Sequence, residues 1–308
     1  MIQASASGKI ILFGEHSVVY NRPAIAVPVT QVQATATIEP AEQGITIRAL
    51  DTNQVISVDT GRYVPADPLA AIVRVTLEHL RVSQADLSIA IHSTIPIASG
   101  LGSSAAVSTA IVRALAQWAT VSLDDATVNA LVYEVEKLQH GTPSGIDNTV
   151  IAYQKPVYYI ANQPIHTFSV ARPFTVAIGN TGIASPTKIA VGDVRKGWES
   201  NRAQYEAWFD QIGTLVQEAR DAIESGAVDR LGAQMDRNQE LLRCIDVSSV
   251  ELERLIDAAK RGGAAGAKLV GGGRGGNMIA LVNDRNLQAV TAALMDAGAA
   301  SVIVTEIK

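Results

Sequence analysis

Short runs of alternating apolar and polar residues dominate the first part of the chain and return near its end. This alternation is typical of β-strands. It predicts strands at 9–13, 24–29, 31–38, 44–49, 55–58 and 86–92, and later at 157–160, 174–178, 268–270, 278–282 and 301–305. Strand patterns therefore occur in both halves of the chain.

Apolar residues recur at helical spacing between these strands. They predict helices at 67–80, 104–119, 124–139 and 287–297, and a long helical region at 188–260 with interruptions near Gly197, Gly226 and Asp246. Residues 141–148 are so rich in turn-forming residues that we expect a loop there. With 308 residues the chain exceeds a usual single core, and we expect two domains, 1–170 and 171–308.

The composition narrows the class of protein. The hydrophobic fraction is 47% and the net charge is −5, with acidic and basic residues interspersed. Without a cluster of Lys and Arg, we expect no nucleic-acid or membrane surface. Cys244 is the only cysteine, which excludes an internal disulfide. We expect a soluble, unprocessed, cytoplasmic enzyme, because the chain has neither a leader pattern nor a long apolar stretch.

The segment Pro96–Ala106 places a glycine-rich loop directly before a predicted helix. Gly100 and Gly102 allow the main chain to approach an anion closely. Ser103 and Ser104 open the helix, whose unpaired N–H groups and positive dipole end favour phosphate. The segment lacks the Lys-Ser/Thr ending of P-loop NTPases and the third glycine of dinucleotide-binding units. An ordinary serine-capped turn is the alternative.

Two further features are candidates for chemistry. The segment Lys268–Met278 holds a dense glycine cluster, which is costly in conformational entropy unless the backbone approaches a ligand; a flexible hairpin is the alternative. Glu136 lies near the end of the predicted helix 124–139, and Asp147 follows in the expected loop 141–148. Two such carboxylates can divide phosphoryl transfer, one holding Mg²⁺ and one taking a hydroxyl proton, although each is also typical of a solvated or turn-forming acid.

Together these segments resemble the GHMP small-molecule kinases. The resemblance rests on three ordered motifs, Lys9–Tyr20, Pro96–Ala105 and Lys268–Gly276, with His140–Asn148 between the second and third. It covers nearly the whole chain, and the mevalonate kinases are the branch with the nearest pattern. It implies a two-domain α+β fold with the active site in the interdomain cleft, the first two motifs belonging to the amino-terminal domain.

The resemblance also implies ATP as the phosphoryl donor and Mg²⁺ as its metal ion. Ser104 and Glu136 match the residues that ligate Mg²⁺, which prefers a few oxygen ligands besides nucleotide phosphates. The residues that match the nucleotide-binding loop are Pro96, Ala98, Ser99, Gly100, Leu101, Gly102, Ser103 and Ser104.

For the acceptor, the resemblance implies mevalonate. Asp147 matches the base that accepts the proton of the acceptor hydroxyl, and Lys9 matches the lysine that stabilises charge on the transferred phosphoryl group. The positions that match substrate contacts are Lys9, Glu15, His16, Asp147, Thr187 and Gly272.

The third motif departs from the family pattern. Where members usually carry Thr-Gly-Ala-Gly, this chain has Val270–Gly273, followed by Arg274. The lost methyl group at Gly272 bears on the shape of the acceptor pocket. Arg274 either contacts nucleotide phosphate or points to solvent.

Other acceptors and another class of function stay open. A galactokinase is disfavoured because Ser17–Val19 lacks the Asp that serves the sugar, and decarboxylases depart from the retained first motif. The alternatives are phosphomevalonate kinase, homoserine kinase and a catalytically silent homologue that binds a metabolite. The silent homologue is disfavoured because the chain retains four motif residues, Lys9, Ser104, Glu136 and Asp147. A homodimer is compatible with the sequence.

Overall fold

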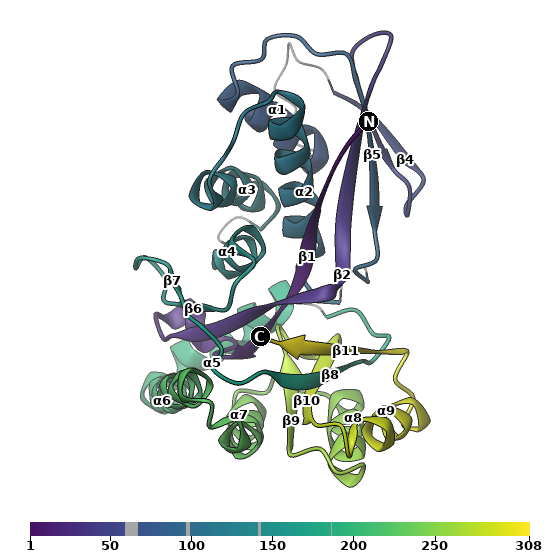
Figure 1. Ribbon diagram of the computed structural model, residues 1–308. Coiled ribbons are helices and arrows are strands. Elements are labelled where there is room, and N and C mark those ends of the chain that lie inside the picture. The colour runs from purple at the N-terminus through teal and green to yellow at the C-terminus, as the bar shows by residue number, and fades with distance from the viewer. Residues whose placement is uncertain (59–66, 97–98, 141–142, 186) are drawn as a thin grey trace. The chain divides into compact units, whose positions relative to one another are not determined.

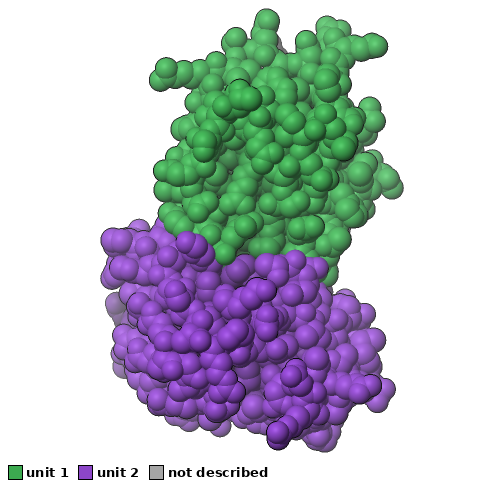
Figure 2. Space-filling view, viewed as in Figure 1, with its two compact units in different colours: residues 1–9, 32–97, 102–154 green, residues 10–31, 98–101, 155–308 purple. Residues whose placement is uncertain are grey.

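The computed structural model describes residues 1–58, 67–96, 99–140, 143–185 and 187–308 (Figure 1). By its internal contacts the chain forms two units, coloured separately in Figure 2. Unit 1 comprises residues 1–9, 32–97 and 102–154, and unit 2 comprises residues 10–31, 98–101 and 155–308. Strands β1 (Ile2–Phe13) and β2 (Ala24–Pro40) contribute residues to both units.

Unit 1 is a sheet with a layer of packed helices. Besides parts of β1 and β2, its elements are β3 (Ile45–Ala49), β4 (Gln54–Val58), β5 (Leu87–Ser93), α1 (Pro68–His79), α2 (Ser103–Trp118), α3 (Asp125–His140) and α4 (Ile146–Tyr153). Strand β3 pairs antiparallel with β4 and parallel with β5, and β5 pairs antiparallel with the end of β2. Leu87, Ile89 and Ile91 alternate along β5 and are buried, as expected for a strand with one face in the core.

Unit 2 contains a four-stranded antiparallel sheet with the order β11-β8-β10-β9. The four strands of this sheet are β8 (Phe174–Asn180), β9 (Gly266–Val270), β10 (Asn277–Val282) and β11 (Ser301–Ile307). Unit 2 also contains β6 (Val157–Tyr159), which pairs with β2, and β7 (His166–Thr167), which pairs with β6. The helices of unit 2 are α5 (Thr187–Ser200), α6 (Arg202–Ser225), α7 (Leu231–Cys244), α8 (Val250–Arg261), α9 (Leu287–Asp296) and the short 3-10 helices η1 (Ser17–Tyr20) and η2 (Val228–Arg230). The core includes Phe209, Leu242, Leu255 and Leu269. Every residue of β9 and β10 is buried.

Two predicted strands, 24–29 and 31–38, are one continuous strand, β2. Residues 24–26 pair with β6, whereas residues 34–40 pair with β5. Pro28 lies between these two paired stretches, where the absence of its N–H breaks neither of these pairings.

Residues 141–142 of the predicted loop 141–148 lie outside the described residues, and the prediction is wrong at the end of the loop, because α4 begins at Ile146 and places Asp147 in a helix. Gly145 precedes the helix with φ 83°, and Ile146, Val150 and Ile151 supply a buried face. The predicted interruption near Gly197 occurs four residues later, at Asn201, between α5 and α6. Helix α5 continues to Ser200, and a side chain at Gly197 would overlap the hydroxyl of Tyr205.

The division into two units differs from the predicted boundary at 170/171. A single cut cannot describe these units, because residues 10–31 and 98–101 belong with the later part of the chain. Within the described residues, no helix combines the length and apolar character that crossing a membrane requires.

Candidate active site

Helix α2 begins immediately after Gly102, in the predicted phosphate loop. Gly102 has φ 77°, and a Cβ atom there would lie 2.8 Å from Cδ1 of Ile151 and 3.0 Å from Cγ of Lys9. Glycine is therefore required both by the left-handed backbone and by the close approach of these two side chains. Among the described residues no side chain caps the start of α2. The first N–H groups of an α-helix have no partner within the helix and are suited to binding an anion.

Lys9 and Asp147 form an ion pair in unit 1, with 2.8 Å between Nζ and Oδ1. Lys9 lies on β1 with its side chain 4% exposed, whereas the Asp147 side chain, in the first turn of α4, is 35% exposed. The cation is thus fixed in the interior while the carboxylate is accessible. Because the Lys9 stem passes Gly102, the structure brings the predicted base, its lysine and the start of α2 together.

Ser104 and Glu136 are also brought together in unit 1. The hydroxyl of Ser104, in the first turn of α2, donates a hydrogen bond of 2.7 Å to Oε1 of Glu136 on α3. One hydroxyl and one carboxylate oxygen are hard ligands of the kind that Mg²⁺ takes alongside phosphate and water. The described residues hold no group of three His, Cys, Asp or Glu side chains suited to a metal ion.

The first part of the glycine-rich loop belongs to unit 2. Asn277, at the start of β10, donates a hydrogen bond of 2.6 Å from Nδ2 to the carbonyl oxygen of Ser99. Leu101 is buried and Gly100 is exposed. Pro96 is half-buried, and Ala98 lies outside the described residues. The contribution of Asn277 had not been predicted, although its position directly after the last glycine cluster is a usable signal.

His16, Gly272 and Thr187, three predicted acceptor contacts, lie together in unit 2. Nε2 of His16 is 3.1 Å from the carbonyl oxygen of Gly272 and must donate to it, because a carbonyl only accepts. A Cβ atom on Gly272 would lie 2.7 Å from Oγ1 of Thr187. The missing methyl group of the third motif is thus explained, since Thr187 occupies its space.

Burial lowers the pKa of His16 from 6.5 to about 4. The hydrogen bond to Gly272 opposes this decrease, and the positive charge of Arg274 adds to it. The imidazole is therefore neutral near pH 7, with its proton on Nε2.

Glu15 is fully buried and contacts protein groups with both carboxylate oxygens. Oε1 pairs with Lys268, and Oε2 accepts a hydrogen bond of 3.1 Å from Nδ2 of Asn238. The side chains of Glu15 and Lys268 have no exposed surface. Lys268 and Asn238 were missed from the sequence. A lysine inside the apolar run 267–270 was the available signal.

The guanidinium of Arg274 is bound by other protein groups, and it neither points only to solvent nor is available to a phosphate. Its Nη1 is 2.6 Å from Oδ2 of Asp193 on α5, and its Nη2 donates to the carbonyl oxygen of Asp246 at 3.0 Å. Its backbone N–H donates to the carbonyl oxygen of Val247 at 2.8 Å. Arg274 therefore joins the third glycine-rich loop to α5 and to the turn after α7.

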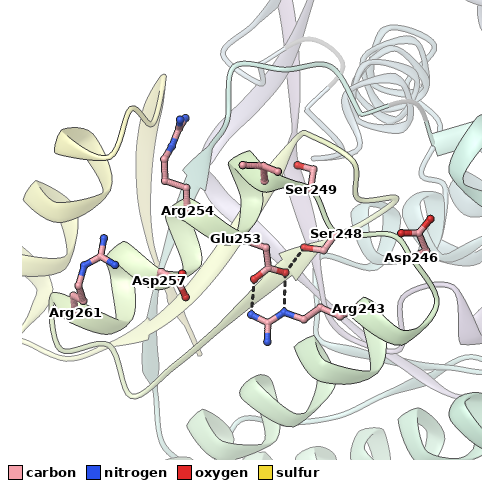
Figure 3. A pocket seen from close by; sticks show the side chains of 9 residues that line it. Arg243, Asp246, Ser248, Ser249, Glu253, Arg254, Asp257 and Arg261 are labelled. Atoms are coloured by element: carbon pink, nitrogen blue, oxygen red, sulfur yellow. Dashed lines mark hydrogen bonds and ion pairs between the residues drawn. The ribbon is translucent and has the colours of Figure 1, made fainter.

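A separate pocket of about 710 Å³ lies beside α8 (Figure 3). Its lining residues are Arg243, Asp246, Ser248, Ser249, Val250, Glu253, Arg254, Asp257 and Arg261. Arg243 and Ser248 both bond Glu253, as the dashed lines show. Three arginines and three acids line this pocket, of which Arg243 and Glu253 form an ion pair, and no predicted site residue lines it.

Comparisons with known proteins cover nearly the whole chain. Residues 69–155 match the family model of the GHMP kinases N terminal domain, and residues 219–300 match that of the GHMP kinases C terminal domain. Mevalonate kinase of Pyrococcus furiosus is 33% identical over 99% of this chain and 95% of its own length. Mevalonate kinase of Pyrococcus abyssi is 36% identical, with coverages of 95% and 92%.

The fold agrees with that of a solved relative. The crystal structure of L. major mevalonate kinase in complex with R-mevalonate superposes with a TM-score of 0.85, at 29% identity, over 99% of this chain and 95% of that one. The expected resemblance and the two-domain α+β fold are confirmed by these matches. On the two domain matches and the full-length likeness, the chain belongs to the GHMP kinase family.

Proposed function

We propose that this chain is an ATP-dependent kinase that phosphorylates the 5-hydroxyl of mevalonate. Family membership implies a small-molecule substrate and ATP with a divalent metal ion. The names of the relatives support mevalonate as the acceptor. The observation that carries the proposal is the Lys9–Asp147 pair beside Gly102, because it combines a base, a cation and a phosphate-binding backbone.

The reaction divides among the residues as follows. The carboxylate of Asp147 accepts the proton of the 5-hydroxyl as its oxygen attacks the γ-phosphorus. The bond from that phosphorus to the β–γ bridging oxygen breaks, and ADP leaves. Lys9, fixed by burial, stabilises the charge that develops on the transferred phosphoryl oxygens.

The nucleotide is held by backbone. The N–H groups at the start of α2 and the loop 99–103 bind its phosphates. Ser104 and Glu136 would hold Mg²⁺, which when bound would neutralise phosphate charge.

The acceptor side of the proposal rests on unit 2. His16, Thr187 and Gly272 form a group that we assign to mevalonate. The expected site between the two domains, the cytoplasmic location and a homodimer remain predictions within this proposal.

A panel of acceptors tests the function. ADP release is measured with Mg-ATP and mevalonate, phosphomevalonate, homoserine or galactose, and the product is identified by mass spectrometry. We expect mevalonate to give the highest kcat/KM and a phosphate ester as product. Preferential turnover of another acceptor would refute mevalonate, and tight binding of one acceptor without turnover would favour the silent homologue.

A further inference from the structure

Within unit 2 the first motif contacts the third at two neighbouring points. Glu15 pairs with Lys268, and the next residue, His16, donates to the carbonyl oxygen of Gly272 at 3.1 Å. Lys268 lies on β9, which leads directly into the third glycine-rich loop. Adjacent residues of one motif therefore hold both the strand and the loop of the other.

The Glu15–Lys268 pair is closed to small molecules. Both side chains are fully buried, and both oxygens of Glu15 are engaged by Lys268 and Asn238. Lys268 also donates to the carbonyl oxygen of Leu269 at 2.6 Å. Burial lowers the pKa of Lys268, and the negative charge of Glu15 counteracts that decrease. The two charges compensate each other. Because the carboxylate is buried and both its oxygens have protein partners, a substrate cannot contact Glu15.

The position of the pair matters to the acceptor group. Lys268 is registered opposite Ile279 of β10, the strand on the other side of the loop. Fixing Lys268 sets where the loop leaves the sheet, and Gly272 follows four residues later. Gly272 in turn packs against Thr187 with no space for a methyl group. A small shift of β9 against Glu15 would thus move the contacts of both His16 and Thr187.

We propose that Glu15 and Lys268 are positioning residues of the acceptor site, acting through His16 and Gly272, and that neither contacts the acceptor. This rests on the proposed function, and it replaces the expected direct contact of Glu15 with substrate. A buried ion pair that loses one partner leaves an uncompensated charge, whereas replacing both by apolar residues of similar volume is often tolerated. That asymmetry separates a positioning pair from a substrate contact.

The test is a double-mutant cycle in the full chain with Glu15→Met, Lys268→Met and the double variant. KM for the acceptor, KM for ATP and kcat are measured with whichever acceptor the parent phosphorylates in the panel, so a wrong acceptor is detected separately. We expect each single change to raise the acceptor KM at least tenfold, with KM for ATP within twofold. The double variant should be less impaired than either single variant.

A direct contact predicts a different pattern. Lys268→Met would then leave the acceptor KM near that of the parent, and the double variant would be as impaired as Glu15→Met; either result overturns the proposal. The exposed pair Glu134 and Lys137, changed to Gln and Met, is the control. If the single variants do not fold, the double variant decides: kcat/KM within tenfold of the parent supports positioning, and loss of turnover in a folded double variant refutes it.

Discussion

Nζ of Lys9 lies 2.8 Å from Oδ1 of Asp147, although one residue is on β1 and the other lies in the first turn of α4. The pair is asymmetric, because the ammonium is buried and the carboxylate is accessible. The buried ammonium of Lys9 orients the carboxylate of Asp147 and leaves it accessible to solvent. This suits a carboxylate that must receive a proton from a small molecule.

Asp147→Asn should lower kcat by a factor of about 100 to 10,000, the usual contribution of a positioned general base. Lys9→Met should lower kcat as well, because charge on the transferred phosphoryl group then lacks its partner. ATP binding, measured by calorimetry, should change little in both variants. Lys137→Met, at an exposed ion pair, is the control. Near-normal turnover of either active-site variant would contradict these roles.

Glu136→Gln should weaken metal binding. The carboxylate accepts from Ser104 at 2.7 Å, and an amide is a poorer ligand for a hard cation. We expect a higher Mg²⁺ concentration for half-maximal activity and weaker Mn²⁺ binding in the presence of ADP, followed by electron paramagnetic resonance. Glu134→Gln, on the same helix and exposed, should match the parent. Equal Mn²⁺ affinity in both variants would show that Glu136 is not a ligand of the metal ion.

Gly272→Ala should raise the KM for mevalonate about tenfold. The new methyl group would meet Thr187 at 2.7 Å, and such overpacking costs about 1–3 kcal/mol. KM for ATP should stay near that of the parent. Gly192→Ala is a matched control, because a Cβ atom on Gly192 meets nothing within 4 Å. An unchanged KM for the acceptor in Gly272→Ala would contradict the assignment of Gly272 and Thr187 to the acceptor site.

Stability should fall as the pH decreases from 6.5 to 4, in part through His16. Its pKa is about 4 in the folded chain and 6.5 when exposed, so in this interval the unfolded chain binds the extra proton. The loss attributable to His16 is at most about 3 kcal/mol and is complete below pH 4. Urea unfolding at several pH values should show a flatter profile for His16→Asn. The exposed His92→Asn is the control, and parallel profiles for parent and His16→Asn would contradict the assignment.

Asp193→Asn should destabilise the chain at neutral pH but not in strong acid. Hydrogen bonds from Arg274 and Lys196 hold the pKa of Asp193 below 3.8. The stabilisation is therefore present above pH 3.8 and is lost as the pH falls through the lower pKa of the folded chain. The difference in Tm between parent and variant, measured across pH, should vanish at the acidic end. Glu199→Gln, at an exposed pair of the same helix, is the control, and a pH-independent difference would exclude the ion pair as its cause.

Local sequence patterns predicted most elements because burial periodicity is a short-range property. They failed at α4, where turn-forming residues overrode the signal of Ile146, Val150 and Ile151, whose buried face depends on packing with other helices. The ion pair of Lys9 and Asp147 was accessible only through family resemblance. The partner of Glu15 was missed because Lys268 lies 253 positions along the chain, and no local pattern encodes such a contact.

The assignment of residues 10–31 to unit 2 has a consequence for synthesis on the ribosome. Most of the other residues of that unit lie in the segment 155–308. Residues 10–31 therefore leave the ribosome long before the residues that they pack against. At typical translation speeds the wait lasts on the order of ten seconds, much longer than strand or helix formation. Its apolar residues, including Ile25, Val27 and Val29, are buried in the folded chain and lack most of the residues that cover them during this interval.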